Sequence, residues 1–143
     1  FSPKRNKYQS VEQIVLEDNH LSNMVMSKVL VSTINTIQKA KNISIEFSCF
    51  HLGRDFLNYF KNKDFTDVKL IVFSDFFLED KMTGGEILRI IKKKKADSTV
   101  VIVSDTENPQ IPVDVINMGA CCFIPKSITS PIFCAELLFQ NVI

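Results

Sequence analysis

The stretches VKLIVFSD (residues 68–75) and TVVIVSD (residues 99–105) decide the fold of this chain. In each of them apolar residues follow one another without alternating polar ones, which is typical of strands buried on both faces of a parallel sheet. Three further apolar runs, at residues 11–16, 43–47 and 121–124, have the length of strands. We therefore expect five strands in one sheet, with helices on both of its faces.

Longer amphipathic segments separate these runs, and each has apolar residues at the three- and four-residue spacing of a helix. Gly119 marks the end of one segment, as a glycine after a helix does, and Ser130-Pro131 marks the start of the last. The expected helices span about residues 20–38, 56–60, 87–91, 109–118 and 128–142. This fivefold alternation predicts the α/β class, a (βα)5 doubly wound five-stranded parallel sheet.

The composition restricts what such a domain does. The 143 residues suit one domain, and 17 Lys and Arg against 16 Asp and Glu leave a formal charge of +1, so no overall field draws the chain onto nucleic acid or anionic lipid. No apolar run approaches the roughly 18–20 residues of a membrane span, so no membrane is expected as a partner. The four cysteines lack metal-binding spacing and are interpreted as buried free thiols of a cytoplasmic protein. Residues 1–10 are expected to be a flexible basic leader and residues 11–143 the domain.

Chemically competent side chains stand where the predicted strands end. The carboxyl ends of parallel strands meet at one edge of the sheet, which is where doubly wound sheets bind ligands. Carboxylates crowded at such an edge repel one another, and a hard cation such as Mg²⁺ relieves that repulsion. A lysine and a hydroxyl opposite the carboxylates suit a phosphoryl group. The side chains concerned are those of Glu17, Asp18, Ser74, Asp75, Ser104 and Lys126.

This pattern resembles that of the receiver domains of bacterial response regulators over residues 11–142. The matches are the acidic pair that binds Mg²⁺, the hydroxyl residue after the fourth strand, the lysine after the fifth and the aromatic switch position, which are here Glu17 and Asp18, Ser104, Lys126 and Phe123. The resemblance implies a flavodoxin-like or CheY-like sheet with strand order 2-1-3-4-5. It also implies a regulatory domain in the cytoplasm that is not an enzyme.

Within that family the chain is most similar to the FixJ/NarL group with LuxR-type output, and in particular to the Rcs-type regulators. The long acidic loop at residues 79–85 and the Asn-Pro spacing from Ser104 to Pro109 carry this resemblance. It implies a transcription regulator whose DNA-binding output domain lies outside this chain, so that DNA is contacted only through that domain.

The position that accepts the phosphoryl group is ambiguous. Counted back from Gly85 through the Rcs-type loop, it falls on Ser74, whose neutral hydroxyl is a poor substitute for a carboxylate as nucleophile and as metal ligand. The favoured interpretation is therefore a degenerate, phosphorylation-independent domain, in which Lys126 balances the acidic residues without Mg²⁺. The alternative is a working receiver with Asp75 as acceptor and Mg²⁺ on the acidic pocket Glu17, Asp18 and Asp75. A shift of one residue at a strand end turns a side chain to the other face, unless the loop re-aims it.

The expected partners follow from the apolar surface. Residues 109–142 and the first helix are rich in apolar side chains, which suits a dimer with a second copy or with another transcription regulator, although these residues also fit a core. The working-receiver alternative adds a sensor histidine kinase. A remote third alternative is a small α/β enzyme that acts on a phosphorylated substrate, but no glycine-rich phosphate loop supports it.

Overall fold

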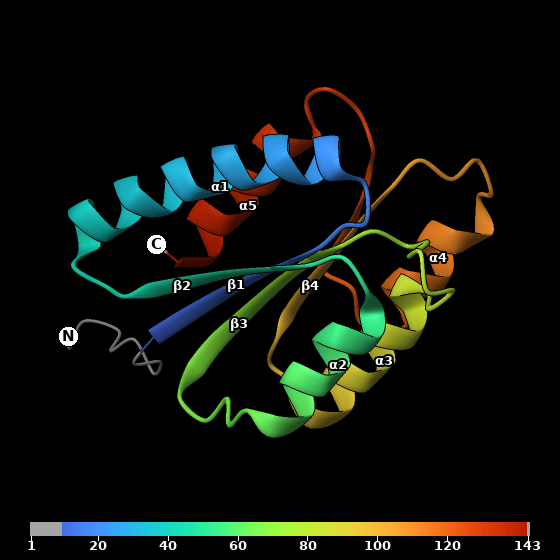
Figure 1. Ribbon diagram of the computed structural model, residues 1–143, viewed down its shortest axis with the longest axis horizontal. Helices are drawn as coiled ribbons and strands as arrows, with labels where there is room; N and C mark the ends of the chain where they lie inside the picture. The colour runs from blue at the N-terminus through green and yellow to red at the C-terminus, as the bar shows by residue number, and fades with distance from the viewer. Residues whose placement is uncertain (1–9, 143) are drawn as a thin grey trace.

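The computed structural model describes residues 10–142, which form five strands and five helices in strict alternation (Figure 1). The predicted α/β class is confirmed. The strands are β1 (Ser10–Leu16), β2 (Ile45–Phe50), β3 (Val68–Ser74), β4 (Thr99–Ser104) and β5 (Cys122–Pro125). The helices are α1 (His20–Lys41), α2 (Gly53–Asn62), α3 (Gly84–Lys94), α4 (Gln110–Asn117) and α5 (Ser130–Val142).

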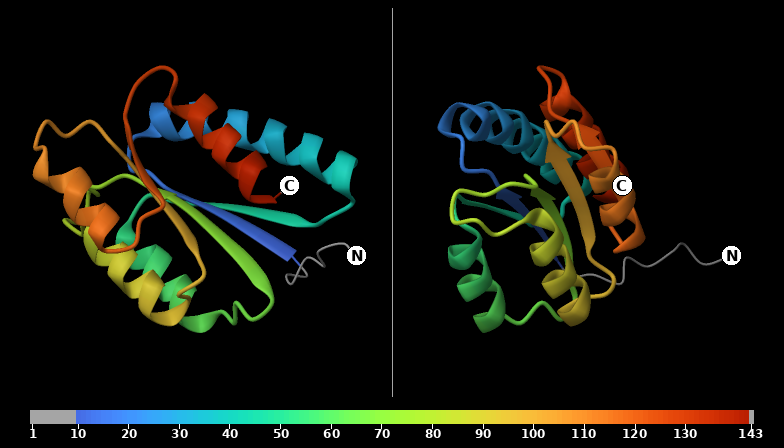
Figure 2. Two further views of the ribbon diagram at one scale, coloured as in Figure 1. Left: turned by 180° about the vertical axis from the view of Figure 1, so that it is seen from behind. Right: turned by 90° about the vertical axis from the view of Figure 1, so that its right-hand side faces the viewer.

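All strand pairs are parallel, and the strand order is β2-β1-β3-β4-β5, as the resemblance implied. The helices α1 and α5 cover one face of the sheet, and α2, α3 and α4 cover the other (Figures 1 and 2). The first strand lies inside the sheet, with Val15 opposite Cys49 of β2 and Phe73 of β3. The carboxyl ends of β1 and β3 are therefore neighbours.

Side chains of successive strand residues point to opposite faces, and this alternation builds two separate cores. On the α2–α4 side, Leu16, Val72 and Ile102 pack with Phe56 and other buried residues of the helices. The core on the α1–α5 side contains Val15, Phe73, Val101, Val103, Met26, Leu30, Cys134 and Leu138. Burial of both faces explains why the central strands have continuous apolar sequences.

Local capping fixes several helix ends. Asn19 begins α1, because its side chain accepts a hydrogen bond from the backbone N–H of Ser22 at 2.9 Å. Thr83 and Glu86 form a reciprocal capping box at the start of α3. Beyond α4, Gly119 has φ of +107°, a conformation that favours glycine, so the predicted stop signal is confirmed.

Two expected boundaries differ from the structure. The second strand was expected at residues 43–47 but spans Ile45–Phe50, because Asn42 ends α1 in the left-handed conformation (φ 52°) and the chain pairs with β1 only from Ile45 onward. Ser10, the last residue of the expected leader, belongs to β1. Residues 1–9 lie outside the described part of the chain.

The cysteines only partly match the expectation of buried thiols. All four are free, but Cys121 is exposed and Cys49 and Cys122 are half-buried, so only Cys134 is buried. Burial raises the pKa of the Cys134 thiol to about 12. Cys121 lies in the bend before the edge strand β5 and not in an inner strand of the sheet, so the prediction that it is buried is wrong.

Among residues 10–142, every helix is too short or too polar to span a membrane.

The apolar residues that the sequence suggests for an interface lie partly on the surface and partly in the interior of the structure. On α4 and α5 the large exposed apolar side chains are those of Val113, Ile116, Ile132, Phe133 and Phe139. On α1 they are those of Leu21, Met24, Val25 and Val31.

Candidate functional site

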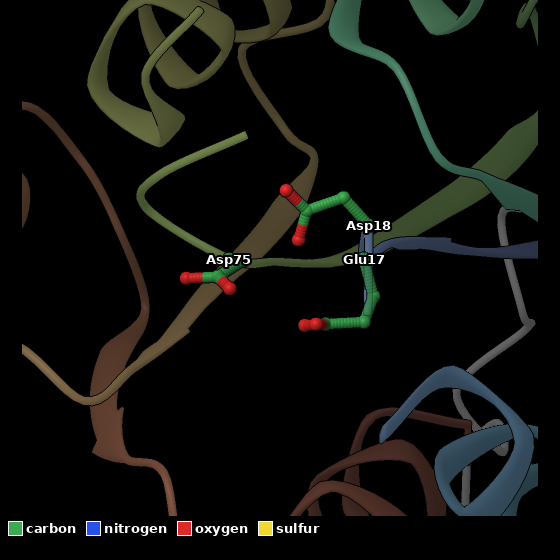
Figure 3. Close-up of side chains that lie close together, drawn as sticks. All are labelled: Glu17, Asp18 and Asp75. Atoms are coloured by element: carbon green, nitrogen blue, oxygen red, sulfur yellow. The ribbon is translucent and has the colours of Figure 1, made fainter. Parts of the chain in front are cut away.

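Four strands deliver the predicted site residues to the carboxyl edge of the sheet. Glu17 follows β1 directly, Asp75 follows β3, Lys126 follows β5, and Ser104 is the last residue of β4. The side chains of Glu17 and Asp18 leave the chain on opposite sides, and both carboxylates are directed toward that of Asp75 (Figure 3). The structure thus brings together the three acidic residues that the sequence singled out.

Strand alternation explains why the carboxylates of Glu17 and Asp75 meet. Val15 and Phe73 face the α1–α5 side of the sheet, so Glu17 and Asp75, two residues further on, point to that same side. The sheet pairing continues past the strand ends, because the backbone N–H of Asp75 donates to the carbonyl of Leu16 at 2.9 Å. This bond holds the start of the β3–α3 loop against the end of β1.

Lys126 is the cation of the site. Its Nζ donates to Glu17 Oε1 at 3.0 Å and to Asp75 Oδ2 at 2.9 Å. Glu17 and Asp75 are only 6% and 8% exposed, whereas the Lys126 side chain is 23% exposed. The backbone N–H of Asn19 also donates to Glu17 Oε1, at 3.2 Å. A single ammonium group therefore bridges two buried carboxylates.

The pKa values reflect this crowding. Burial raises the pKa of Glu17 above its ordinary value, and the nearby Asp75 raises it further, although the hydrogen bond from Lys126 acts in the opposite direction. Burial by itself lowers the pKa of Lys126, but its hydrogen bonds to Asp75 and Glu17 outweigh burial and raise that pKa. Lys126 is therefore held in its charged form, while the charge of Glu17 is only partly compensated.

The donor set fits a magnesium ion. Ligand atoms of Glu17, Asp18 and Asp75 lie within 4.8 Å of one another. Carboxylate oxygens are the ligands that this hard cation prefers, and it is bound through few carboxylates together with water or substrate oxygens. Lys126 contacts two of the three acidic residues, so the site carries a partial charge balance without a metal.

The two predicted hydroxyl residues have different surroundings. Ser74 is buried and its Oγ donates to the backbone carbonyl of Asp75 at 2.8 Å. The Oγ of Ser104 is also buried but has no hydrogen-bond partner within residues 10–142. A buried hydroxyl without a partner is costly, so Ser104 is a donor still available to a ligand. Which residue accepts a phosphoryl group, Ser74 or Asp75, stays a prediction.

The predicted switch residue Phe123 lies apart from the carboxylates. It is half-buried on β5, opposite Ile102 of β4, and it packs against the core on the α2–α4 side. Its role as a switch stays a prediction.

The sequence left three residues near the site unassigned. A Cβ on Gly84 would lie 2.8 Å from the carbonyl oxygen of Asp75, so the loop passes the helix start too closely for a side chain. The Gly84-Gly85 pair signalled this approach. Asp80 accepts a hydrogen bond from the backbone N–H of Arg54 at 2.9 Å, which ties the β3–α3 loop to α2. His51 Nδ1 lies 3.0 Å from the carbonyl oxygen of Glu17.

No protein-family model matches the sequence. No curated protein matches it either. The similarity that exists is therefore one of structure.

Solved receiver domains are similar to the chain over nearly its whole length. The signal receiver domain of a DNA-binding response regulator (MerR) from Colwellia psychrerythraea 34H has a TM-score of 0.72 at 14% identity, over 93% of this chain and 98% of that one. A CheY-like receiver domain protein from Methanospirillum hungatei JF-1 has 0.68 at 17%, over 93% and 94%. The beryllofluoride-activated receiver domain dimer of NtrC4 has 0.61 at 17%, over 92% and 98%. These similarities show a CheY-like receiver fold.

Proposed function

We propose that the chain is a receiver domain of a response regulator and that Asp75 is its phospho-acceptor. The observation that carries this proposal is the meeting of three carboxylates, from Glu17, Asp18 and Asp75, within 4.8 Å of one another at the carboxyl edge of a CheY-like sheet. Lys126 bonds two of them. Nucleophile, cation ligands and a fixed positive charge are then available in one place, as phosphoryl transfer requires.

The reaction assigned to Asp75 is a simple displacement. One carboxylate oxygen attacks the phosphorus of a phosphodonor, an O–P bond to Asp75 forms, and the bond to the donor's leaving group breaks. The Oδ2 atom is held by Lys126, and Oδ1 accepts a bond from the backbone N–H of Phe77 at 3.4 Å. The side chain is thus oriented before any donor arrives.

Three groups of this chain would stabilise the transferred phosphoryl group. Lys126 supplies a fixed ammonium charge, and the unpartnered Ser104 hydroxyl supplies a donor. Mg²⁺ held by Glu17, Asp18 and Asp75 would neutralise charge on the phosphoryl oxygens. The buried, partly uncompensated state of Glu17 favours the arrival of a further cation.

A second candidate function is a phosphorylation-independent dimerisation domain. The ion pairs of Lys126 with both buried carboxylates favour it, because they balance much of the charge without a metal. In that case Ser74 occupies the acceptor position, and the exposed apolar surface of α4 and α5 would pair with a second copy or with another transcription regulator.

The experiment treats the chain with acetyl phosphate and Mg²⁺ and follows its intact mass. We expect the gain of one phosphoryl group, which is labile to hydroxylamine because it is an acyl phosphate. Asp75→Asn should abolish the gain, and Ser74→Ala, a neighbouring change that leaves the carboxylates in place, should retain it. Addition of beryllofluoride with Mg²⁺ should shift the amide signals around residues 74–84.

The other outcomes discriminate between the candidates. A gain that survives Asp75→Asn but is lost in Ser74→Ala would contradict the assignment to Asp75. The absence of any gain and of any Mg²⁺-dependent shift, with self-association unchanged, would contradict the phosphorylation proposal and leave the dimerisation domain.

The proposal also includes the subgroup of response regulators to which the chain is assigned. The acidic loop at residues 79–85 supports a place in the FixJ/NarL group, close to the Rcs-type regulators, with a LuxR-type output domain outside this chain. A sensor histidine kinase would then be the phosphodonor, and DNA would be contacted only through the output domain.

A further inference from the structure

A cavity of about 230 Å³ lies next to the carboxylate cluster on the α1–α5 side of the sheet. Residues of the start of α1 and of the β5–α5 loop line it together. Its walls are largely apolar and come from α1, the strand ends and the β5–α5 loop. They include Leu21, Val25, Met26, Phe73, Ile128 and Pro131.

The floor of this cavity is charged. Glu17, Asp75 and Lys126 all line it, so two buried carboxylates and one ammonium group face the same apolar space. Their formal charges sum to minus one, and Asp18, which lies within 4.8 Å of the other carboxylates, adds a further negative charge nearby. Within residues 10–142 no hydrogen bond reaches Glu17 Oε2. The floor therefore lacks one positive charge.

Phosphoryl transfer to Asp75 requires the carboxylates and the lysine, but no step of that reaction requires the apolar wall of the cavity. A phosphoryl group is compact and hydrophilic, whereas Leu21, Val25 and Ile128 present exposed hydrocarbon at the rim of the cavity. Apolar walls combined with a few convergent polar groups are typical of small-molecule sites. The apolar wall therefore indicates a ligand that has an apolar part.

We propose that this cavity binds a small amphipathic amine, with its ammonium group on Glu17 and Asp75 and its hydrocarbon or aromatic part between α1 and the β5–α5 loop. The charge of the floor selects a cation, and the walls select an apolar body. An apolar cavity of about 150 Å³ is large enough for a benzene ring. The present cavity therefore has room for a ring with a short aminoalkyl chain.

This site goes beyond the proposed phosphorylation but shares two carboxylates with it. The amine and a magnesium ion would compete for Glu17 and Asp75, so amine binding would oppose activation of the same domain. Binding itself depends only on the cavity and its charges, and it is measured without Mg²⁺ and without a phosphodonor. Failure of one proposal is therefore distinguishable from failure of the other.

The test titrates the isotope-labelled 143-residue chain with 2-phenylethylamine and follows its amide signals. Two probes with the same ring serve as controls, the neutral 2-phenylethanol and the anionic phenylacetate. We expect saturable shifts centred on Leu21, Val25 and Ile128 for the amine. The alcohol should bind about tenfold more weakly or worse, because it lacks a charge-assisted hydrogen bond, and phenylacetate should not bind.

Three variants sharpen the result. Val25→Phe fills the cavity and should weaken amine binding about tenfold. Val31→Phe is the matched control, because Val31 lies on the same helix with 40% exposure against 44% for Val25 but does not line this cavity. Glu17→Gln should weaken binding of the amine while that of the alcohol stays unchanged, which separates loss of charge from loss of fold.

Several outcomes would overturn the proposal. These are equal binding of amine and alcohol, equal loss of binding in both phenylalanine variants, and no saturable shift with the amine. Shifts of the same residues that depend on protein concentration alone would also overturn it, because a second copy would then cover the cavity.

Discussion

Lys126 bridges the carboxylates of two residues that are only 6% and 8% exposed, and it balances one of their two negative charges. Removing one partner of a buried ion pair leaves an uncompensated charge, which costs more than the pair itself contributes. Because the lysine is partly solvated, we expect the cost here to lie below that of a fully buried pair.

We predict that Lys126→Met lowers the free energy of unfolding by about 1–3 kcal/mol at about pH 7.5. Asp75 then repels Glu17 without compensation, so the pKa of Glu17, which burial already raises, rises further above its value in the unfolded chain. The folded variant then binds more protons than the unfolded chain. Its stability therefore falls as the pH rises from the unfolded pKa of Glu17 to the folded pKa of Glu17. In urea unfolding, the loss of free energy of unfolding caused by Lys126→Met should therefore be smaller at about pH 5 than at about pH 7.5.

Lys28→Met is the matched control, because Lys28 is exposed on α1, and it should change stability little. Added Mg²⁺ should restore part of the stability of Lys126→Met at about pH 7.5, since it binds the folded state only. A loss that is equal at both pH values would show that repulsion between the carboxylates is not its cause.

The residue types of the site could be predicted from the sequence, because strand ends in a parallel sheet converge and alternation sets the side on which each residue points. The choice between Ser74 and Asp75 could not be made from the sequence, since counting along a loop assumes the length of that loop, and the acceptor stays a prediction. In the structure the Asp75 carboxylate meets Lys126, while the Ser74 hydroxyl bonds to the backbone. The cavity beside them had no sequence signal, because residues far apart in the chain form it.

At the scale of elements, the β3–α3 loop is packed against the start of α3. The backbone N–H of Gly84 donates to the carbonyl of Phe76 at 2.6 Å, and a Cβ on Gly84 would lie 2.8 Å from the carbonyl oxygen of Asp75. The atoms in the way belong to the backbone, so a side chain here must displace the loop that carries Asp75.

We predict that Gly84→Ala lowers the free energy of unfolding by about 1–3 kcal/mol, as overpacking does, and also weakens Mg²⁺ binding. Gly85→Ala is the control one residue further on. Its Cβ would meet nothing closer than 3.6 Å, so the gain in helix propensity should stabilise the protein by about 0.4–1 kcal/mol. Thermal unfolding and magnesium titration of both variants check this. The prediction fails if Gly84→Ala is as stable as Gly85→Ala.

The same loop also caps α2. Leu52, at the N-cap of that helix, offers no side-chain hydrogen bond, and Asp80 instead accepts a bond from the backbone N–H of Arg54. Partial burial by itself raises the pKa of the Asp80 carboxyl. The hydrogen bonds that it accepts from backbone N–H groups, those of Arg54 and Met82 among them, outweigh burial and hold this pKa below its usual value. A residue 26 positions away in the chain thus satisfies a helix terminus.

We predict that Asp80→Ala destabilises the fold by about 0.5–2 kcal/mol, the usual cost of a lost cap. A carboxylate with a lowered pKa stabilises the fold above the pKa of the unfolded chain and loses that effect as the pH falls through its folded value. The difference between wild type and variant should therefore shrink below about pH 4. Glu79→Ala, at the exposed neighbouring residue, should change little, and equal losses would contradict the cap.

Element types could be predicted because apolar runs and helical spacing dominate the sequence, but element ends depend on local caps. The end of α1 at Asn42 and the later start of β2 follow from a left-handed residue that periodicity does not reveal. The cap from Asp80 is a contact between distant segments, which no local pattern predicts.

At the scale of the whole molecule, the apolar side chains that remain exposed are concentrated on α1, α4 and α5. Two cores already bury the faces of the sheet, and none of these exposed side chains belongs to either core. A shallow cavity between β5 and α5 continues this surface to the edge of the sheet. It is lined by Phe123 of β5 and by Phe133 and Leu137 of α5. Such a surface suits self-association.

We predict that the chain self-associates and that Phe133→Glu weakens this association about tenfold or more, since a charge replaces a large apolar side chain at the contact. Phe77→Glu is the matched control, because Phe77 is 53% exposed against 50% for Phe133 but belongs to the β3–α3 loop and not to α4 or α5. Sedimentation equilibrium over a range of protein concentrations measures both. Equal effects of the two variants would show that exposed phenylalanine promotes non-specific association. A monomer at every concentration would contradict the prediction, because an apolar surface that drives self-association must show a dependence on protein concentration.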